Sequence, residues 1–474
     1  MSQLTADCLN KILEYLKDDM FTLHSCLLVN RLWCEVSVRF FWRNNYDHST
    51  SNFVTLIACL PVESKEILSK NGIIISIPTS KLPIFNYASF CKVLLVDQVY
   101  YKLKQILKNQ KSISSQNLSN NMYILTKEIF KLYMSQIGSL KELIFQEYLD
   151  TNFYSYPEAK DCLKNLSKLT CSSNISSEFF YQLSQICHNI SSLDLSVEKV
   201  ISNGLTDLIS VQKNLKYLNI NHYTNGDLKD IISSLANPNK INKLVLYTLQ
   251  HTLLSFITKF TDLQELGLFL NYYRCFKDFE KLQYAIFPKL QILKIRSASS
   301  KYELLIKFLE NNGDNLKECH IDNYRNRNRN SNSLNLAIAK FCPNLQKLST
   351  GFKSSELETL KIVYNSCQYL ESINIWCGGE YLSEKEALEA FVKYSHKNVY
   401  EIILYHVYST RSKLLPEELE SFFISWTNRV PQKLLSLIII NNYNNSLDIN
   451  AENMKIINKY INLGVIKKFK KIIL

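Results

Sequence analysis

A three-position apolar pattern with the spacing LxxLxL recurs from residue 140 to the end of the chain, and it constrains the fold more than any other feature. The first copy is Leu140, Leu143 and Phe145. Thirteen copies can be read, with first positions at Leu140, Leu166, Ile190, Leu215, Ile241, Leu263, Leu290, Leu316, Leu345, Leu370, Val399, Leu434 and Phe469. They lie 22 to 29 residues apart as far as Val399, and the last two intervals are 35 residues. A unit of this size cannot cover its own apolar face, so neighbouring units must stack and share one interior.

The last two positions of each copy alternate, as in a short strand that turns both side chains to one face. Segments such as KLVLYTL and YEIILYH are rich in strand-forming residues, and the stretches between copies have helical spacing, as in Phe179, Leu183 and Ile186. The period matches leucine-rich repeats of about 20 to 29 residues, whereas a solenoid of helix pairs, the competing interpretation, repeats at roughly 40. We therefore predict an α/β leucine-rich-repeat solenoid with parallel strands on the concave face and helices on the convex face.

The repeats depart from the usual pattern at one polar position. The asparagine that normally follows the third apolar position by three residues occurs only as Asn174, Asn271 and Asn442. Since its side chain ordinarily satisfies backbone groups at the turn, the backbone here must find other partners.

Residues 3 to 43 have a different pattern, which predicts three short helices. Leu9, Ile12, Leu13 and Leu16 share one side of the first, and further helices follow around residues 23–30 and 32–42. A module of some 40 residues is too small to be securely stable alone. It would gain stability by docking onto a partner, or by capping the open end of the solenoid.

The string QLTADCLNKILEYLKDDMFTLHSCLLVNRLWCEVSVRFFWRN resembles an F-box. The apolar and aromatic positions of that family are occupied here by Leu4, Leu9, Ile12, Leu16, Leu23, Cys26, Val29, Trp33 and Trp42. The family's proline is replaced by Thr5, which can still cap a helix. Over nearly its whole length the chain resembles F-box leucine-rich-repeat proteins of the kind abundant in some fungi.

This resemblance implies that the chain is a substrate-recognition adaptor of a cullin-RING (SCF-type) ubiquitin ligase. The N-terminal module would bind the small Skp-type linker subunit, and the solenoid would hold a protein substrate of unknown identity. The implied contacts with the linker are Leu4, Thr5, Leu9, Ile12, Leu16 and Trp33.

The sequence predicts three parts of the chain. Residues 1–45 form the F-box-like helical module, residues 46–135 form a connecting and capping region, and residues 136–474 form a leucine-rich-repeat solenoid of about 13 repeats.

A formal charge of +12 favours acidic partners through long-range steering. Arg325, Arg327 and Arg329 form a candidate loop for an acidic partner, although short charge runs of this kind are usually solvated surface. An alternative function is therefore a scaffold independent of ubiquitin that binds an acidic protein or, less expectedly, nucleic acid.

Motifs for catalysis are absent from the sequence. There is no GxxxxGK[ST], HExxH, GxSxG or kinase-type HRD motif, and no CxxC pair. We therefore expect a protein that is not an enzyme and has no catalytic, cofactor-binding or metal-binding residues. The first 20 residues lack a secretory signal, and no apolar run approaches the roughly 20 residues of a membrane helix. This pattern predicts a protein of the cytoplasm, the nucleus or both, without a membrane partner.

Overall fold

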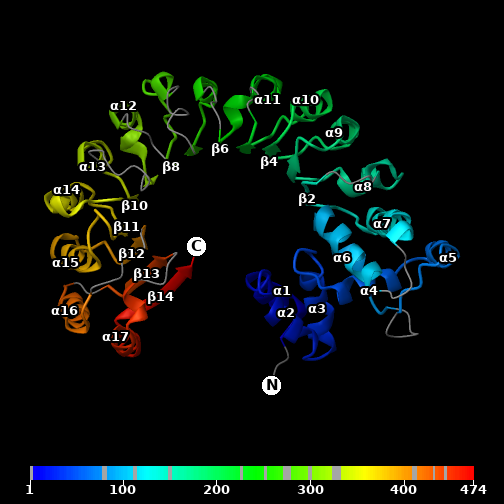
Figure 1. The fold of residues 1–474 in the computed structure, drawn as a ribbon, viewed down its shortest axis with the longest axis horizontal. Coiled ribbons are helices and arrows are strands. Elements are labelled where there is room, and N and C mark those ends of the chain that lie inside the picture. Colours follow the sequence, from blue (N-terminus) through cyan, green and yellow to red (C-terminus); the bar gives the residue numbers. More distant parts are fainter. Residues whose placement is uncertain are drawn as a thin grey trace. The chain divides into compact units, whose positions relative to one another are not determined.

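The computed structural model describes residues 4–76, 83–109, 115–147, 152–224, 228–249, 254–270, 279–296, 302–322, 332–407, 414–430, 433–441 and 446–473. The chain divides into two compact units (Figure 1). Unit 1 comprises residues 1–221 and 228–237, and unit 2 comprises residues 222–227 and 238–474. Each unit is described by itself.

Unit 1 begins with the three predicted helices: α1 (Ala6–Tyr15), α2 (Met20–Leu27) and α3 (Arg31–Phe41). Each starts at a side chain that accepts a hydrogen bond from a free backbone N–H of the first turn. Thr5 accepts from Cys8, Asp19 from Thr22, and Asn30 from Trp33. The helices bury Leu9, Leu13, Leu23 and Val36 between them and their surroundings. The small module thus has its own apolar interior.

Five strands of unit 1 pair in chain order: β1 (Val93–Leu95), β2 (Glu142–Phe145), β3 (Lys168–Ser172), β4 (Ser192–Val197) and β5 (Tyr217–His222). The register places Leu143 beside Leu169 and Leu169 beside Leu193, so the middle positions of successive copies align. Leu94 of β1 aligns with Leu143. The sheet thus begins within residues 46–135, one strand before the first copy of the sequence pattern.

The helices of unit 1 precede, separate or follow these strands. They are α4 (Thr50–Ala58), α5 (Val62–Lys70), α6 (Val96–Lys108), α7 (Ser115–Gln136), α8 (Ala159–Leu163), α9 (Ser177–Ile186), α10 (Asn203–Ser210) and α11 (Lys229–Ser234), with short 3-10 helices at Tyr87–Phe90 and Phe153–Ser155.

The strands of unit 2 continue the pattern: β6 (Lys243–Thr248), β7 (Glu265–Leu270), β8 (Ile292–Arg296), β9 (Glu318–Asp322), β10 (Lys347–Thr350), β11 (Ser372–Cys377), β12 (Glu401–His406), β13 (Leu435–Asn441) and β14 (Ile466–Ile473). Each pairs in parallel with the next. Parallel neighbours in strict chain order require a crossover after each strand, which is the arrangement of a leucine-rich-repeat solenoid.

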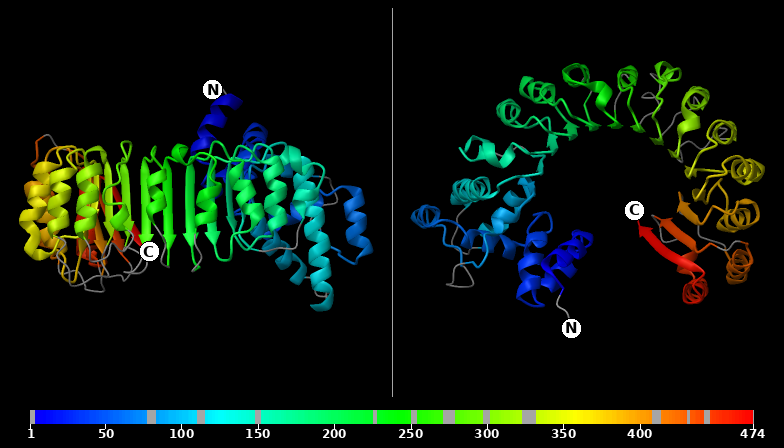
Figure 2. Two further views of the ribbon diagram at one scale, coloured as in Figure 1. Left: turned by 90° about the horizontal axis from the view of Figure 1, so that it is seen from above. Right: turned by 180° about the vertical axis from the view of Figure 1, so that it is seen from behind.

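The crossovers of unit 2 are α12 (Tyr302–Asn312), α13 (Asn332–Phe341), α14 (Leu357–Ser366), α15 (Glu384–Tyr394), α16 (Pro416–Thr427) and α17 (Ala451–Asn462). Short 3-10 helices lie at Pro238–Lys240, Leu254–Lys259, Gly313–Asn315, Ser354–Glu356 and Leu447–Ile449. Within the unit, the helices lie on the convex side of the sheet and the strands on the concave side, as predicted (Figures 1 and 2). One face of the strands is therefore covered, and the other is open.

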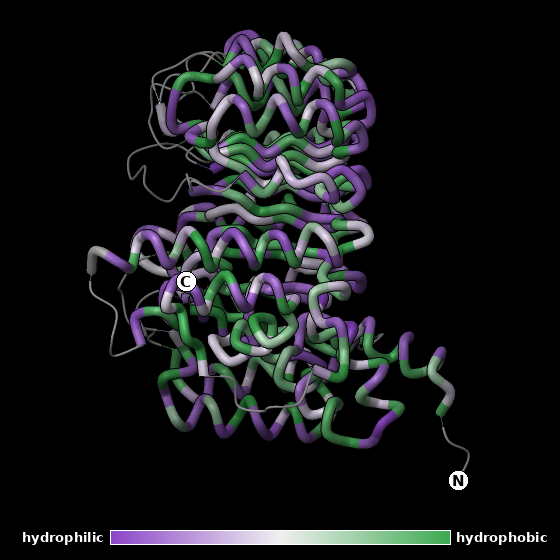
Figure 3. Tube along the Cα trace, turned by 90° about the vertical axis from the view of Figure 1, so that its right-hand side faces the viewer, coloured by the Kyte–Doolittle hydropathy of each residue, from purple (hydrophilic) through white to green (hydrophobic). Residues whose placement is uncertain are grey.

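The interior consists of the side chains that the LxxLxL pattern specifies. In the copy that contains β7, for example, Leu263, Leu266 and Leu268 are completely buried, while Glu265 stays partly exposed. Figure 3 shows this alternation of hydrophobic and hydrophilic residues along the chain. Each fully buried leucine contributes about 1.5–3 kcal/mol relative to an exposed one, so the repeated pattern is also the main source of cohesion.

The last copy departs from the predicted register, and the copy before it departs only at its first position, since Leu437 and Ile439 pair with Ile402 and Leu404 as predicted. Leu434 is 50% exposed, and an irregularity between Leu435 and Ser436 places Leu435 in the interior instead. Leu437 pairs with Phe469, so Phe469 occupies the middle position of its copy and not the first. The sequence reading of β14 was three residues out of register.

Asparagine side chains stabilise the solenoid at the start of the strands. The amide groups of Asn315, Asn344 and Asn398 donate to the backbone oxygens of Pro288, Asp314 and Gln368, at 3.1, 2.8 and 3.0 Å. Each of these oxygens belongs to the preceding repeat. Asn174, at the usual position of the family's asparagine, instead donates to Glu198, and Asn271 and Asn442 lie outside the described residues. These three asparagines thus lie at the edge of the sheet where the strands begin, whereas the predicted asparagine would lie just after each strand.

None of the helices among the described residues combines the length and the apolar character needed to cross a membrane.

Candidate interaction surfaces

The N-terminal module exposes an unusual share of large apolar side chains. Six of the thirty such exposed residues in the described chain lie between residues 4 and 29. They are Leu4, Ile12, Tyr15, Phe21, Leu28 and Val29. Tyr15, Phe21 and Leu28 are 92%, 85% and 78% exposed. Scattered exposed apolar residues are ordinary, but such a density in one small module is typical of a docking surface.

The six residues predicted to contact a linker subunit do not all lie at the surface. Leu4, Thr5 and Ile12 are exposed, and Thr5 also caps α1 by accepting from Cys8 at 3.4 Å. Leu16 and Trp33 are partly exposed. Leu9 is completely buried. Leu9 therefore contributes to the interior of the module, and a partner could touch only the other five.

The second predicted surface, the loop of Arg325, Arg327 and Arg329, lies outside the described residues.

The inner face of unit 2 is formed by the strand side chains that point away from the helices. From β6 to β14 its described residues include six basic side chains, Lys243, Lys294, Arg296, Lys347, Lys468 and Lys470, and four acidic ones, Glu265, Glu318, Asp322 and Glu401. The corresponding strand positions of unit 1 hold one basic and two acidic residues: Lys168, Glu142 and Asp194. The excess of positive charge among these rows thus belongs to unit 2.

The charges of this face form ion pairs between neighbouring strands. Glu265 lies between Lys243 and Lys294, at 3.0 and 2.8 Å. Glu318 is 2.7 Å from Lys347 and 3.5 Å from the ring of His320. One carboxylate therefore serves two basic groups in each of these clusters.

The pKa values follow from these contacts. Burial alone would raise the pKa of Glu318, but the hydrogen bonds and charges of Lys347 and His320 outweigh it and lower the pKa overall. Burial would likewise raise the pKa of Glu265, but Lys294 and Lys243 outweigh it and lower the pKa overall. Burial lowers the pKa of His320, despite the opposing effect of Glu318, so the ring is neutral at pH 7.

The paired charges are arranged in two layers. The side chain of Lys347 is 51% exposed and that of its partner Glu318 is 22% exposed. Arg296 and Asp322, 3.0 Å apart, are 50% and 20% exposed. In the pairs Lys243–Glu265, Lys294–Glu265 and Lys468–Glu401, the basic side chain is likewise more exposed than the carboxylate. Basic groups therefore stand toward the solvent, with carboxylates beneath them.

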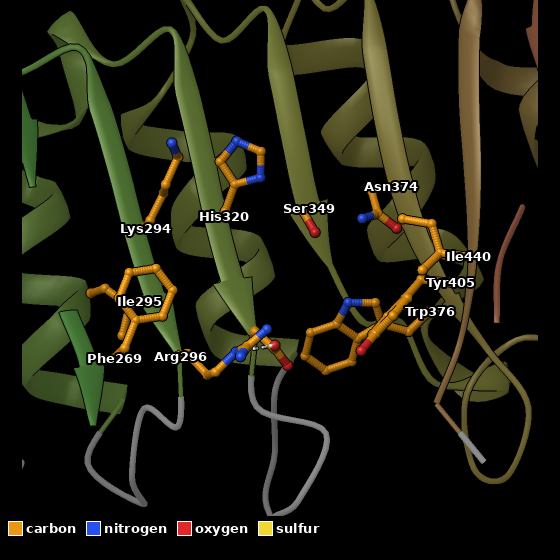
Figure 4. A pocket seen from close by; sticks show the side chains of 11 residues that line it. Phe269, Lys294, Ile295, Arg296, His320, Ser349, Asn374, Trp376, Tyr405 and Ile440 are labelled. Carbon is orange, nitrogen blue, oxygen red and sulfur yellow. Dashed lines mark hydrogen bonds and ion pairs between the residues drawn. The ribbon is translucent and has the colours of Figure 1, made fainter. Parts of the chain in front are cut away.

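A hollow of about 250 Å³ opens on this face, and we name it the β10 trough (Figure 4). It forms because Ser349 presents only a short side chain to the inner face, between His320 on β9 and Asn374 on β11. One wall carries Arg296 and Asp322 on β8 and β9, and the other carries Trp376 and Tyr405 on β11 and β12. The volume is below that of typical pockets for small-molecule ligands, about 300–1,000 Å³, and suits a single side chain.

Trp376 is held in place by the turn that follows β11. Its ring packs edge-on against Tyr381, with ring centroids 5.2 Å apart. The chain reverses through Gly378 and Gly379, both with positive φ, which glycine adopts without strain. A Cβ atom on Gly351 would approach Trp376 to 2.4 Å, so only glycine leaves room for the indole ring. The aromatic wall is thus fixed before any partner binds.

Asn374 brings an amide group to the same trough. Its Oδ1 is buried and has no hydrogen-bond partner among the described residues. The amide nitrogen points toward the side where Ser349 lies (Figure 4). Burying an acceptor without a partner costs about 1–3 kcal/mol, so packing alone gives no reason for an asparagine here.

The residues of the trough were not predicted from the sequence. The signal is the small residue Ser349 at the position where neighbouring copies carry Lys294, His320 and Asn374. Only the strand register makes that comparison visible.

Within the described ranges, no three His, Cys, Asp or Glu side chains are grouped so that they could hold a metal ion. The described cysteines are all free thiols, and burial raises the pKa of Cys91, Cys187 and Cys319 to about 12, so these three stay protonated and unreactive.

Comparison with family models and with curated proteins gives no match to this chain. Among solved structures, the leucine-rich repeat-containing protein LegL7 from Legionella pneumophila is similar, with 18% identity, a TM-score of 0.35 and coverage of 62% of this chain and 93% of that chain. The assignment of the fold rests on the strand order and register described above.

Proposed function

We propose that this chain is a protein-binding scaffold that itself carries out no chemistry. The observation that carries the proposal is the open inner face of unit 2, where basic, aromatic and amide side chains stand on a rigid parallel sheet. Function in repeat proteins of this kind resides in the residues displayed on the scaffold, and extended concave faces commonly serve as binding surfaces.

We further propose that the scaffold is a substrate adaptor of a cullin-RING ubiquitin ligase of the SCF type. The resemblance of residues 3–43 to an F-box is the basis of this step, and the exposed apolar side chains of α1 and α2 support it. A partner that covers Leu4, Ile12 and Tyr15 would stabilise a small module whose interior is limited. Such an adaptor would act in the cytoplasm or the nucleus.

The adaptor would promote ubiquitin transfer by proximity alone. Its N-terminal module would anchor to the Skp-type linker subunit, while the solenoid would hold the substrate near the ubiquitin-loaded enzyme. Tethering raises the effective concentration of a substrate lysine without any catalytic group on the adaptor.

Co-purification of the full chain with a Skp-type linker subunit tests this proposal. The double variant Leu4→Asp/Ile12→Asp places two charges on the exposed surface, so we expect its recovery of the linker to fall at least about tenfold. Leu9→Asp is unsuitable, because a charge at this buried position would unfold the module.

The matched control is Val200→Asp/Ile84→Asp, two exposed apolar residues elsewhere in unit 1. It should retain the linker fully. The adaptor proposal fails if the wild-type chain recovers no linker, or if both double variants recover as much as the wild type.

A scaffold independent of ubiquitin is the second candidate. The outward layer of basic groups on the inner face of unit 2 favours it, because that layer needs no linker subunit to attract an acidic protein.

A further inference from the structure

We propose that the inner face of unit 2 binds an acidic segment of a partner protein and takes one of its aromatic or apolar side chains into the β10 trough. This inference rests on the proposed role of the chain as a protein-binding scaffold, and it does not depend on the ubiquitin ligase.

The layering of charge selects an acidic partner. An approaching chain meets Lys294, Arg296 and Lys347 before it meets the carboxylates beneath them, which are 13% to 22% exposed. Glu265 already interacts with both Lys243 and Lys294, so it cannot fully neutralise both. Carboxylates of a partner would complete the coordination of these lysines.

The geometry of the trough selects a protein over a nucleic acid. Nucleic acid needs a dense row of basic groups to replace its counterions, whereas basic and acidic residues alternate here from strand to strand. A hollow of about 250 Å³ beside Trp376 and Tyr405 fits one side chain of an extended segment.

The bound segment would give the amide group of Asn374 a role that packing alone does not explain. Its amide nitrogen points toward the space beside Ser349 and can donate to a backbone or carboxylate oxygen of the bound segment. With the lysines and Arg296, the groups around the trough are mostly donors, and an acidic segment is rich in acceptors.

Fluorescence anisotropy with labelled synthetic polymers and the purified full chain tests the proposal without any ligase subunit. The probes are a random copolymer of glutamate and tyrosine, a copolymer of lysine and tyrosine, polyglutamate, and single-stranded oligothymidylate. We expect the glutamate–tyrosine copolymer to bind most tightly, polyglutamate to bind more weakly, and binding of both to weaken as salt is added. Equal or tighter binding of the lysine copolymer or of oligothymidylate would overturn the proposal.

Charge variants locate the site. Removing one exposed ion pair costs about two- to fivefold in affinity, so Lys294→Gln/Lys347→Gln should weaken copolymer binding by about tenfold. The matched control is Lys455→Gln/Lys459→Gln on α17, which removes the same charge from a helix on the convex side. Equal losses in the two double variants would show attraction by net charge only and would refute the site.

Two further variants separate the trough from the charged layer. Tyr405→Ala should abolish the preference for the tyrosine copolymer over polyglutamate. Asn374→Leu should weaken binding by about fivefold while the midpoint of unfolding stays unchanged or rises, because the buried Oδ1 has no partner to lose. If both variants bind like the wild type, the trough is not part of the binding site.

If the chain binds the copolymer but recovers no linker subunit, this inference stands and the adaptor proposal fails. If the chain recovers the linker subunit but does not bind the copolymer, the adaptor proposal stands and this inference fails.

Discussion

Single residues determine where the open face of unit 2 is hollow. The short side chain of Ser349 leaves the β10 trough open, and Gly351 leaves room for Trp376, which forms part of one wall. One short side chain between longer ones on the neighbouring strands is thus enough to make a hollow.

Replacing Gly351 by alanine tests the packing of this wall. The added Cβ would lie 2.4 Å from Trp376 and 2.5 Å from Tyr381, so the rings must shift, and we expect a loss of about 1–3 kcal/mol in the free energy of unfolding. Near-ultraviolet circular dichroism and chemical denaturation measure the change. Gly138→Ala is the control, since its Cβ would meet nothing within 4 Å. Equal stability of the two variants would contradict the close packing.

Whether a single residue is buried could be predicted from the sequence only where burial depends on the local repeat pattern. Positions such as Leu266 and Leu268 could be assigned because burial in a repeat depends on a local pattern. The exposure of Ile12 and the burial of Leu9 on the same helix depend on what packs against that helix, which the pattern alone does not state. The trough was missed because it depends on three neighbouring strands at once.

Between elements, one histidine connects α3 to α4 in unit 1. His48 is 2% exposed and lies against Trp42, with ring centroids 4.7 Å apart, and against Phe53 of α4. Its Nε2 is 3.2 Å from the backbone oxygen of Phe41, and its Nδ1 has no partner among the described residues. The ring is thus suited to the neutral form with the proton on Nε2.

Burial lowers the pKa of His48 to about 4 from an ordinary value of 6.5. The unfolded chain therefore binds this proton more readily, and the contribution of His48 to stability is complete above pH 6.5 and is lost as the pH falls toward 4. We expect a loss of about 3 kcal/mol over this range. Chemical denaturation of the wild type and of His48→Gln, followed by circular dichroism at several pH values, tests this. The variant should lack this part of the pH dependence, and an unchanged pH profile would refute the assignment.

The strands were predictable to different degrees along the sheet. The copies from Leu140 to Val399 lie in the predicted register, because each keeps its buried residues three and then two positions apart. In β14 the sequence IKKFKKII offers apolar residues in two registers, and the irregularity before Ser436 selects the one that the spacing did not indicate. The first strand, β1, escaped notice because Cys91 and Val96 occupy positions usually filled by leucine.

On the scale of the whole molecule, the strands of each unit pair only with their neighbours in the chain. Stability in such a structure is close to a sum of contacts between adjacent repeats. A local defect should therefore spread to adjacent repeats first and reach distant ones last.

Cys319→Asp provides such a defect, because it places a charge at a completely buried position of β9. Hydrogen exchange of the full chain should show lost protection in β8, β9 and β10, while β2 and β3 in unit 1 keep theirs. Leu336→Asp, at an exposed position of α13, is the control and should leave the pattern intact. Uniform loss of protection in both units would show one cooperative unit in place of nearest-neighbour coupling.

The layered charges of unit 2 have a consequence for chemical modification. Acetylation of the inner-face lysines would not leave a neutral surface. Among the described residues of these rows, Arg296 would be the one cation left against Glu265, Glu318, Asp322 and Glu401. The face would reverse its sign and repel the molecules that it previously attracted. An acylating reagent or enzyme would thus change the preference of this surface from acidic to basic molecules.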